Sequence, residues 1–141
     1  MKDWERNLLQ CLLYVMFDVI REYHLINTAK SWNDAQSYCR ANYTDLATIG
    51  NSKDMKTVVS KTAASGVTRE IWIGLTETRA SSWLWSVGET ETSSGVVENT
   101  NWAPGEPSST TSNCGGMQSN GRWFSSSCST TLPFVCQSGR I

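Results

Sequence analysis

The sequence predicts one domain of the α+β class, and its length and two kinds of apolar periodicity support that prediction. The chain has 141 residues, enough for one domain and too few for two with separate cores. Two segments with the period of a helix come first, and downstream the apolar residues change to the alternation of a strand. Helices followed by a run of strands are typical of α+β domains. The seven tryptophans indicate a packed core or a binding surface rather than disorder.

The first strand and the first helix follow directly on each other. Residues 23–27 alternate, which predicts a strand. Ser31 followed by Asp34 indicates a capping box with Ser31 as the N-cap, so we expect a helix from here to about Ala41. One stripe of this helix is expected to face the core, formed by Trp32, Ala35 and Cys39.

A second helix and two short strands come next. The helix begins at Asn51 or Ser52, either of which can cap it, and ends at Gly66. Its inward stripe consists of four residues at helical spacing: Met55, Val58, Val59 and Thr62. Residues 71–75 and 83–86 are rich in β-branched and aromatic side chains, which predicts two strands.

A long polar stretch from Val87 to Asn113 has no clear periodicity and contains several glycines and prolines. An ordered loop of this length within a compact domain is typical of a binding function. Three short strands are expected after it: residues 116–119, 122–125 and 133–137. The Asn120-Gly121 pair between the first two of them predicts a tight hairpin turn.

Charge and cysteine content exclude several classes of function. The formal net charge is −1, from 12 basic and 13 acidic residues spread along the chain, which argues against a nucleic-acid binder with its basic patch. His24 is the only histidine, which excludes a site built from several histidines. Five cysteines indicate an oxidising compartment, and the odd count leaves at least one without a partner in the chain.

Residues 1–20 form a leader, and we place the domain at residues 21–138. The apolar run Cys11–Phe17 is far shorter than the ~20 residues that cross a bilayer, so we expect no membrane span. It reaches the lower limit of the ~7–15 residues of a signal-peptide core, but acidic residues flank it and no small-residue cleavage site follows. The leader is therefore a signal segment, a short amphipathic helix on the domain, or a non-native start.

Position alone leaves the disulfide pairing open. A bridge between Cys39 and Cys136 would join the two ends of the domain, and a bridge between Cys114 and Cys128 would fasten the long loop to the final hairpin. The fifth cysteine, Cys11, lies in the leader. Cleavage of the leader would remove it, whereas an intact leader would carry a reactive or intermolecular thiol.

Several short motifs follow one another in the order and at the spacing found in C-type lectin-like domains. They are the four cysteines of the domain, Trp72-Ile-Gly-Leu75, Trp83-x-Trp85, Asn101-Trp102, Gly105-Glu-Pro107, Trp123-x4-Cys128 and Pro133-Phe-Val-Cys136. Each motif is weak alone, but their order and spacing are specific together and cover roughly residues 21–137. The chain therefore resembles the short form of this family, as a single domain.

The resemblance implies a C-type lectin-like fold with two helices, small antiparallel sheets and a long ligand-binding loop. It implies that the first cysteine of the domain pairs with the fourth and the second with the third, which gives the disulfides Cys39–Cys136 and Cys114–Cys128. It also implies a secreted or otherwise extracellular domain, in which the long loop and the last strands form the ligand surface.

Family members that bind sugar through calcium use a Glu-Pro-Asn tripeptide in the long loop and a glutamate two residues before the second cysteine. Glu106 and Pro107 match this pattern, but Ser108 stands in the place of the asparagine. Ser112 stands in the place of the second glutamate, although the neighbouring Asn113 offers an amide oxygen. The resemblance thus points to this segment as the ligand site and shows that the calcium ligands are incomplete.

Two further calcium ligands are missing after the conserved tryptophan, where Phe124 and Ser125 replace an Asn-Asp pair. Because Ca²⁺ takes six to eight oxygens, several of them charged, Glu106 alone is a weak candidate and we expect no cofactor. Trp102 and Phe124 would form an aromatic platform for a sugar ring or a protein side chain, unless Trp102 packs beneath the loop. Four other tryptophans are expected in the core: Trp72, Trp83, Trp85 and Trp123.

Two binding functions follow from these observations. The first is a recognition module that binds a glycan or protein ligand on a cell or microbial surface without calcium, for example in innate immunity. The second is a calcium-dependent lectin with a residual site at Glu106, Ser108 and Asn113. An enzyme is not expected, because His24 has no nucleophile beside it in the sequence. Asn42-Tyr43-Thr44 is an N-glycosylation sequon, which makes Asn42 a candidate glycan acceptor.

Overall fold

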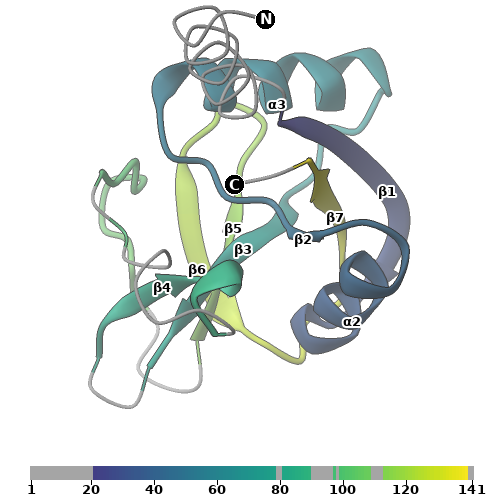
Figure 1. The fold of residues 1–141 in the computed structure, drawn as a ribbon. Helices are drawn as coiled ribbons and strands as arrows, with labels where there is room; N and C mark the ends of the chain where they lie inside the picture. Colours follow the sequence, from purple (N-terminus) through teal and green to yellow (C-terminus); the bar gives the residue numbers. More distant parts are fainter. Residues whose placement is uncertain (1–20, 79–80, 90–96, 98, 109–112, 140–141) are drawn as a thin grey trace, which may run out of the picture.

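The computed structural model describes residues 21–78, 81–89, 97, 99–108 and 113–139. Its described strands form one twisted sheet in the order β1-β7-β3-β5-β6, with β2 beside β7 and β4 beside β3 (Figure 1). The strands are β1 (Glu22–Lys30), β2 (Asp45–Leu46), β3 (Ile71–Glu77), β4 (Trp83–Trp85), β5 (Asn113–Met117), β6 (Trp123–Ser127) and β7 (Leu132–Ser138). The helices are α2 (Trp32–Asn42), α3 (Ser52–Ala64) and the 3-10 helix η1 (Ser86–Glu89). The predicted α+β class is confirmed.

Helix α2 begins as the sequence predicts. The Ser31 hydroxyl accepts a hydrogen bond from the Asp34 N–H at 3.3 Å, which satisfies one of the donors that every helix start leaves unpaired. The predicted inward stripe is buried: Trp32, Ala35 and Cys39 are at most 1% exposed.

Helix α3 begins at Ser52, and its N-cap is Asn51 rather than the alternative Ser52. The Asn51 side chain accepts from the Asp54 N–H at 2.8 Å. The helix ends just before Gly66, whose φ of +72° is left-handed and suits glycine because it carries no Cβ. The stripe is confirmed in part, because Val58 and Thr62 are buried while the other two residues are half-buried.

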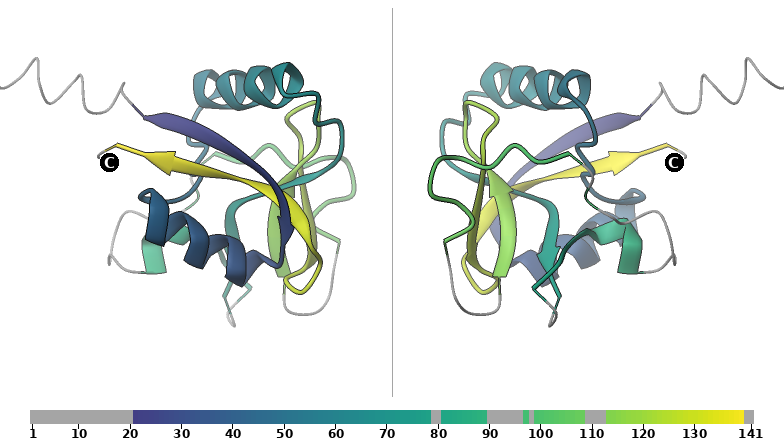
Figure 2. Two further views of the ribbon diagram at one scale, coloured as in Figure 1. Left: turned by 90° about the vertical axis from the view of Figure 1, so that its right-hand side faces the viewer. Right: turned by 90° about the vertical axis from the view of Figure 1, so that its left-hand side faces the viewer.

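Strand β3 divides the core into two clusters on opposite faces of the sheet. Ile71, Ile73 and Leu75 pack with the Val58 side chain of α3, whereas Trp72 packs with the buried side of α2. Figure 2 shows the two helices on opposite sides of the strands. The alternation along β3 is what the two-residue period of a strand requires, and it explains why the segment is apolar on both faces.

Strand β5 lies earlier in the chain than the predicted residues 116–119. Its glycines hid it, since glycine is a poor strand former. The packing requires them: a Cβ on Gly115 would collide with the Leu75 side chain, and one on Gly116 would collide with the Ile71 carbonyl and the Phe124 ring.

The ends of the other elements differ from the predicted ones by only a few residues. β1, β3, β6 and β7 are longer than predicted, and Ser86 begins η1 instead of ending a strand. β2 was not predicted, because two residues are too few for a periodic signal. The predicted turn at Asn120-Gly121 is present: Gly121 has φ +90° and donates to the Gln118 carbonyl at 2.9 Å.

The two disulfides of the domain are Cys39–Cys136 and Cys114–Cys128, as the resemblance implies. The first links α2 to β7 across 97 residues, and the second links β5 to the turn after β6 across 14 residues. The leader, with Cys11, lies outside the described residues. Within the described part of the chain, no helix has the length and apolar character needed to cross a membrane.

Candidate functional site

The end of the long loop runs beside β6 and is fastened to it through the backbone. The Trp123 N–H donates to the Asn101 carbonyl at 2.8 Å, and the Ala103 N–H donates to the Trp123 carbonyl at 2.9 Å. Trp102 thereby forms an isolated parallel bridge with Trp123. This pairing extends the sheet by one short segment and places Glu106 next to Ser125 of β6.

Glu106 is the centre of a closed hydrogen-bond network. One carboxylate oxygen, Oε1, accepts from the Ser125 N–H at 2.6 Å and from the Ser125 hydroxyl at 3.0 Å. The other, Oε2, accepts from the Ser108 hydroxyl at 2.6 Å. The Ser108 N–H donates to the Ser125 hydroxyl oxygen at 2.9 Å, and the Glu106–Pro107 peptide bond is cis. Both carboxylate oxygens are therefore engaged by the protein itself.

These hydrogen bonds change the acidity of Glu106. Partial burial would raise the pKa of its carboxyl, but the hydrogen bonds from the Ser108 hydroxyl and from the N–H and hydroxyl of Ser125 outweigh burial and lower the pKa below the ordinary 4.5. The carboxylate is ionised at neutral pH, and it holds the loop segment against β6.

We expect acid to release this segment. Because the folded-state pKa of Glu106 lies below its unfolded-state value, its stabilisation is complete above pH 4.5 and is lost as the pH falls through the folded-state pKa. Thermal unfolding from pH 7 to pH 3 measures the loss as a falling Tm. The Glu106→Gln variant should have a lower Tm at pH 7 and should converge on the original chain in acid. Parallel Tm curves for the two proteins would contradict this role of Glu106.

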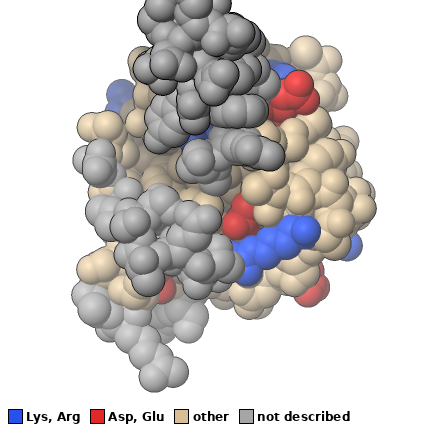
Figure 3. Space-filling model, in the orientation of Figure 1, with Lys and Arg blue, Asp and Glu red and all other residues tan. Residues whose placement is uncertain are grey.

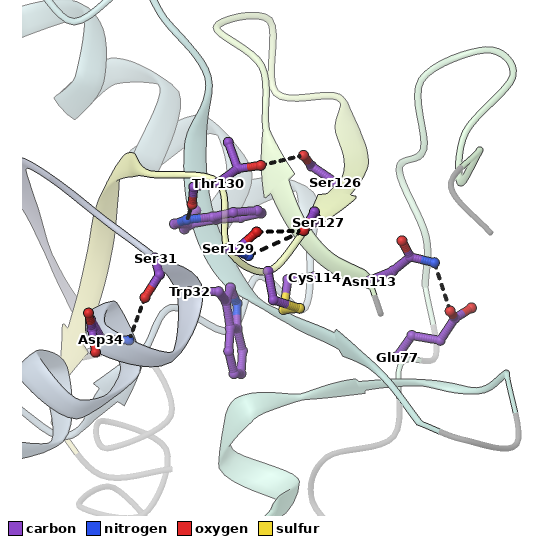
Figure 4. The surroundings of a disulfide bond; sticks show 12 residues. Ser31, Trp32, Asp34, Glu77, Asn113, Cys114, Ser126, Ser127, Ser129 and Thr130 are labelled. Carbon is purple, nitrogen blue, oxygen red and sulfur yellow. Dashed lines mark hydrogen bonds between the residues drawn. A yellow bond between two sulfur atoms is a disulfide. The ribbon is translucent and has the colours of Figure 1, made fainter. Parts of the chain in front are cut away.

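Asn113 and Glu77 form a second polar pair beside the Cys114–Cys128 disulfide. The Asn113 amide donates to Glu77 Oε1 at 2.9 Å, as Figure 4 shows. The pairing of Thr76 with Cys114 places these two residues opposite each other at the ends of β3 and β5. Glu77 was not predicted as a site residue. The sequence did hold a signal for it: if the strand predicted at residues 71–75 is extended by two residues, the Glu77 carboxylate lies at the loop edge of the sheet.

The donors among the described residues do not fit a calcium ion of the kind the resemblance suggests. Ca²⁺ requires six to eight oxygens, with several carboxylates among them. In the described residues no group of three or more His, Cys, Asp or Glu is placed to hold a metal. The Glu106 oxygens already accept three hydrogen bonds from serines, and Ser108 offers a hydroxyl in the place of an amide.

The predicted aromatic platform of Trp102 and Phe124 is wrong. Phe124 is 6% exposed, and its ring stacks on Trp72 in the core beneath α2, with the ring centroids 6.1 Å apart. Trp102 instead packs edge-on against Trp83 and Trp123, at centroid distances of 4.8 and 5.6 Å. The β6 pleat turns successive side chains to opposite faces, so Trp123 packs in the core cluster beside α3 and Phe124 in the cluster beside α2. Trp72, Trp85 and Trp123 are buried as predicted, whereas Trp83 is only half-buried.

His24 has a serine partner in space that the sequence does not place beside it. Its Nε2 lies 2.8 Å from the Ser138 hydroxyl, but the neighbouring Glu22 carboxylate approaches the same nitrogen, at 3.9 Å. A catalytic triad needs the acid on the other ring nitrogen, where it orients the base. The ring also stacks on Tyr43 at 4.3 Å. This contact therefore lacks the geometry of an activated nucleophile.

The visible charges do not form one patch. In Figure 3, Lys and Arg side chains lie apart from one another, with Asp and Glu side chains close to several of them. The described residues on this face thus carry no continuous basic surface of the kind that nucleic acids require. Asn42 is exposed at the end of α2, where its amide donates to the Tyr38 carbonyl at 3.0 Å, and its glycosylation stays a prediction.

Comparisons with known proteins agree with this geometry. The family model described as "Lectin C-type domain" matches residues 28–138. The chain is 32% identical over 117 residues to human lymphocyte antigen 75, an alignment that covers 82% of this chain and 7% of that protein. The chain therefore spans only a small part of this relative.

Solved structures show the same architecture. Human lithostathine superposes with a TM-score of 0.75 at 25% identity, covering 85% of this chain and 92% of that one. A structure described as a calcium-independent type II antifreeze protein superposes with a TM-score of 0.72 at 22% identity, covering 86% and 88%. With a family model that matches most of its length and the two disulfides in place, this chain belongs to the C-type lectin domain family.

Proposed function

We propose that this domain is an extracellular recognition module that binds a glycan or a protein ligand on a cell or microbial surface without calcium. Its membership of a family of binding domains supports the general function. Its two disulfides support an oxidising compartment outside the cytosol. The observation that carries the calcium independence is the Glu106 network, in which both carboxylate oxygens accept hydrogen bonds from serines.

The ligand surface is the part of β6 and of the loop around the Glu106–Pro107 bond. Pro107 and Ser108 are exposed and Ser125 is half-buried, so they present hydroxyls and a rigid ring to a ligand. In a calcium site the metal would order these groups. Here the charge-assisted hydrogen bonds of Glu106, which are stronger than neutral ones, order the loop before a ligand arrives. Such preorganisation lowers the entropic cost of binding.

A solved structure with the same fold supports the proposal that this architecture can lack a calcium ion. The antifreeze protein noted above is described as calcium-independent. At 22% identity that likeness concerns the fold, and it indicates that the architecture does not depend on a bound calcium ion.

The competing function is a calcium-dependent lectin that uses Glu106, Ser108 and Asn113. One observation favours it, because Asn113 is held by the Glu77 carboxylate, which brings a second acidic group to the same end of the sheet. A calcium ion bound there would have to compete with the hydrogen bonds that now occupy Glu106.

A binding screen with and without calcium separates the two functions. The full, oxidised chain is applied to immobilised glycans and to whole microbial and animal cells, once with calcium chloride and once with EDTA. We expect the same ligands and the same signal in both buffers. The Ser125→Ala variant should weaken binding several-fold, because it removes the hydroxyl that joins Glu106 to Ser108.

The matched control is Ser60→Ala, which changes an exposed serine on α3 and should leave binding unaltered. Binding that disappears in EDTA and returns with added calcium would support the calcium-dependent function and overturn our proposal.

A further inference from the structure

A pocket of about 300 Å³ lies between the start of α3 and the chain segment that precedes Trp102. Ile49, Met55 and Trp123 supply its apolar walls. The polar residues that line it are Asn51, Ser52, Asn99, Thr100 and Asn101. This volume is at the small end of the range for ligand pockets, and an apolar interior with a few placed polar groups is their usual character.

Two of the amides are oriented by their partners in the protein. The Asn51 oxygen accepts from the Asp54 N–H at 2.8 Å, so the group that Asn51 can offer a ligand is its NH₂ donor. The Asn101 NH₂ donates to the Gly121 carbonyl at 2.8 Å and contacts the Met55 sulfur at 3.0 Å. Asn101 is therefore left with its carbonyl oxygen as an acceptor. The lining thus combines one fixed donor with one fixed acceptor.

The apolar walls of the pocket and its lack of charged residues restrict the chemical class of the ligand further. None of the described residues that line it is charged, which disfavours phosphate, sulfate and carboxylate ligands. Met55 has a flexible thioether that adapts to small apolar groups. Trp123 is 2% exposed, and its indole N–H has no acceptor among the residues that the structure describes. This nitrogen lies beneath the surface of the pocket, so Trp123 offers a ligand its apolar ring rather than its N–H donor.

We propose that this pocket binds the acetamido group of a 2-acetamido sugar. The acetamido carbonyl accepts from the Asn51 amide, its N–H donates to the Asn101 carbonyl, and its methyl group packs against Ile49 and Met55. A sugar with a hydroxyl in place of the acetamido group lacks both the planar donor–acceptor pair and the methyl group.

This pocket is a second site, separate from the surface around Glu106. Trp123 begins β6 at the end that faces α3 (Figure 1), whereas Ser125, which holds Glu106, lies further along the strand. Binding in the pocket does not rest on the proposed function, and it should persist in the Ser125→Ala variant.

The Asn51→Asp variant tests the donor directly. Aspartate keeps the oxygen that caps α3, and it is as good a cap as asparagine, but it replaces the NH₂ donor with a carboxylate oxygen that repels the acetamido carbonyl. Asn33→Asp, at an exposed position in the first turn of α2, adds the same charge elsewhere and serves as the control. The Tm of each variant checks that its fold is intact.

The measurement is a titration of the full, oxidised chain with N-acetylglucosamine or glucose, followed by ¹H–¹⁵N NMR. We expect saturable shifts of the Trp123 indole signal and of the Ser52 and Asn101 amides with N-acetylglucosamine, and at least tenfold weaker binding of glucose. Asn51→Asp should weaken the binding of N-acetylglucosamine about tenfold, because it removes one hydrogen bond and adds a repulsion. Asn33→Asp should leave this affinity unchanged. Equal binding of the two sugars, shifts confined to residues 106–108 and 125, or an unaffected Asn51→Asp variant would overturn the proposal.

Discussion

Removal of the Cys39–Cys136 disulfide, by replacing both cysteines with alanine, should destabilise the domain by about 4–5 kcal/mol. The bridge closes a loop of 97 residues, and in the chain-entropy model the loss grows with the length of the closed loop. Both cysteines are buried between α2 and β7, so the variant also loses apolar packing. Urea unfolding of the purified variant, monitored by tryptophan fluorescence, measures the change in the free energy of unfolding.

The second disulfide provides the matched comparison. The Cys114–Cys128 bridge closes only 14 residues, and its removal should cost about 3 kcal/mol by the same reasoning. Cys128 is half-buried, so less packing is lost. If the loss of the short-range bridge destabilised the domain more than the loss of the long-range one, loop length would not be the main source of the stabilisation.

The Trp72→Ala substitution is expected to cost about 3–5 kcal/mol. Trp72 is fully buried, and its indole N–H donates to the carbonyls of Lys30 and Thr130 at 3.1 Å each. The substitution leaves a cavity beside Phe124 and removes the side chain that joins the end of β1 to the turn before β7. Denaturant unfolding gives the magnitude.

Trp83→Ala is the control for this prediction, since it deletes the same side chain at a half-buried position on β4. Its main aromatic contact is the edge-on stack with Trp102, so it should cost clearly less than Trp72→Ala. Equal losses for the two variants would contradict the central position of Trp72 in the core.

The elements with strong local signals could be predicted from the sequence. The Ser31 cap and the stripe Trp32, Ala35 and Cys39 predicted α2 within one residue, because capping and helical spacing act within a few residues of the chain. β5 could not be placed correctly. Its glycines are required by the Leu75 and Phe124 side chains, which come from other strands of the sheet.

The candidate site shows the same division. Glu106, Ser108 and Ser125 were predicted as site residues from the resemblance, and the structure brings these three together. What the sequence could not show is that the serines donate to the carboxylate. Phe124 was misplaced on the surface because it stands in the position of a calcium ligand of the family, where this chain instead turns an aromatic ring into the core. Glu77 was missed because β3 is longer than its apolar run.

The central proposal is that Glu106 is committed to its own chain and does not bind calcium. The most direct measurement is ¹H–¹⁵N NMR of the backbone amides of Ser125 and Ser108, which hydrogen-bond within the Glu106 network, while calcium chloride is added to the oxidised chain at neutral pH. We expect both signals to stay unchanged up to millimolar calcium, as they would with magnesium as the control ion. A saturable shift of both amides that EDTA reverses would contradict the proposal.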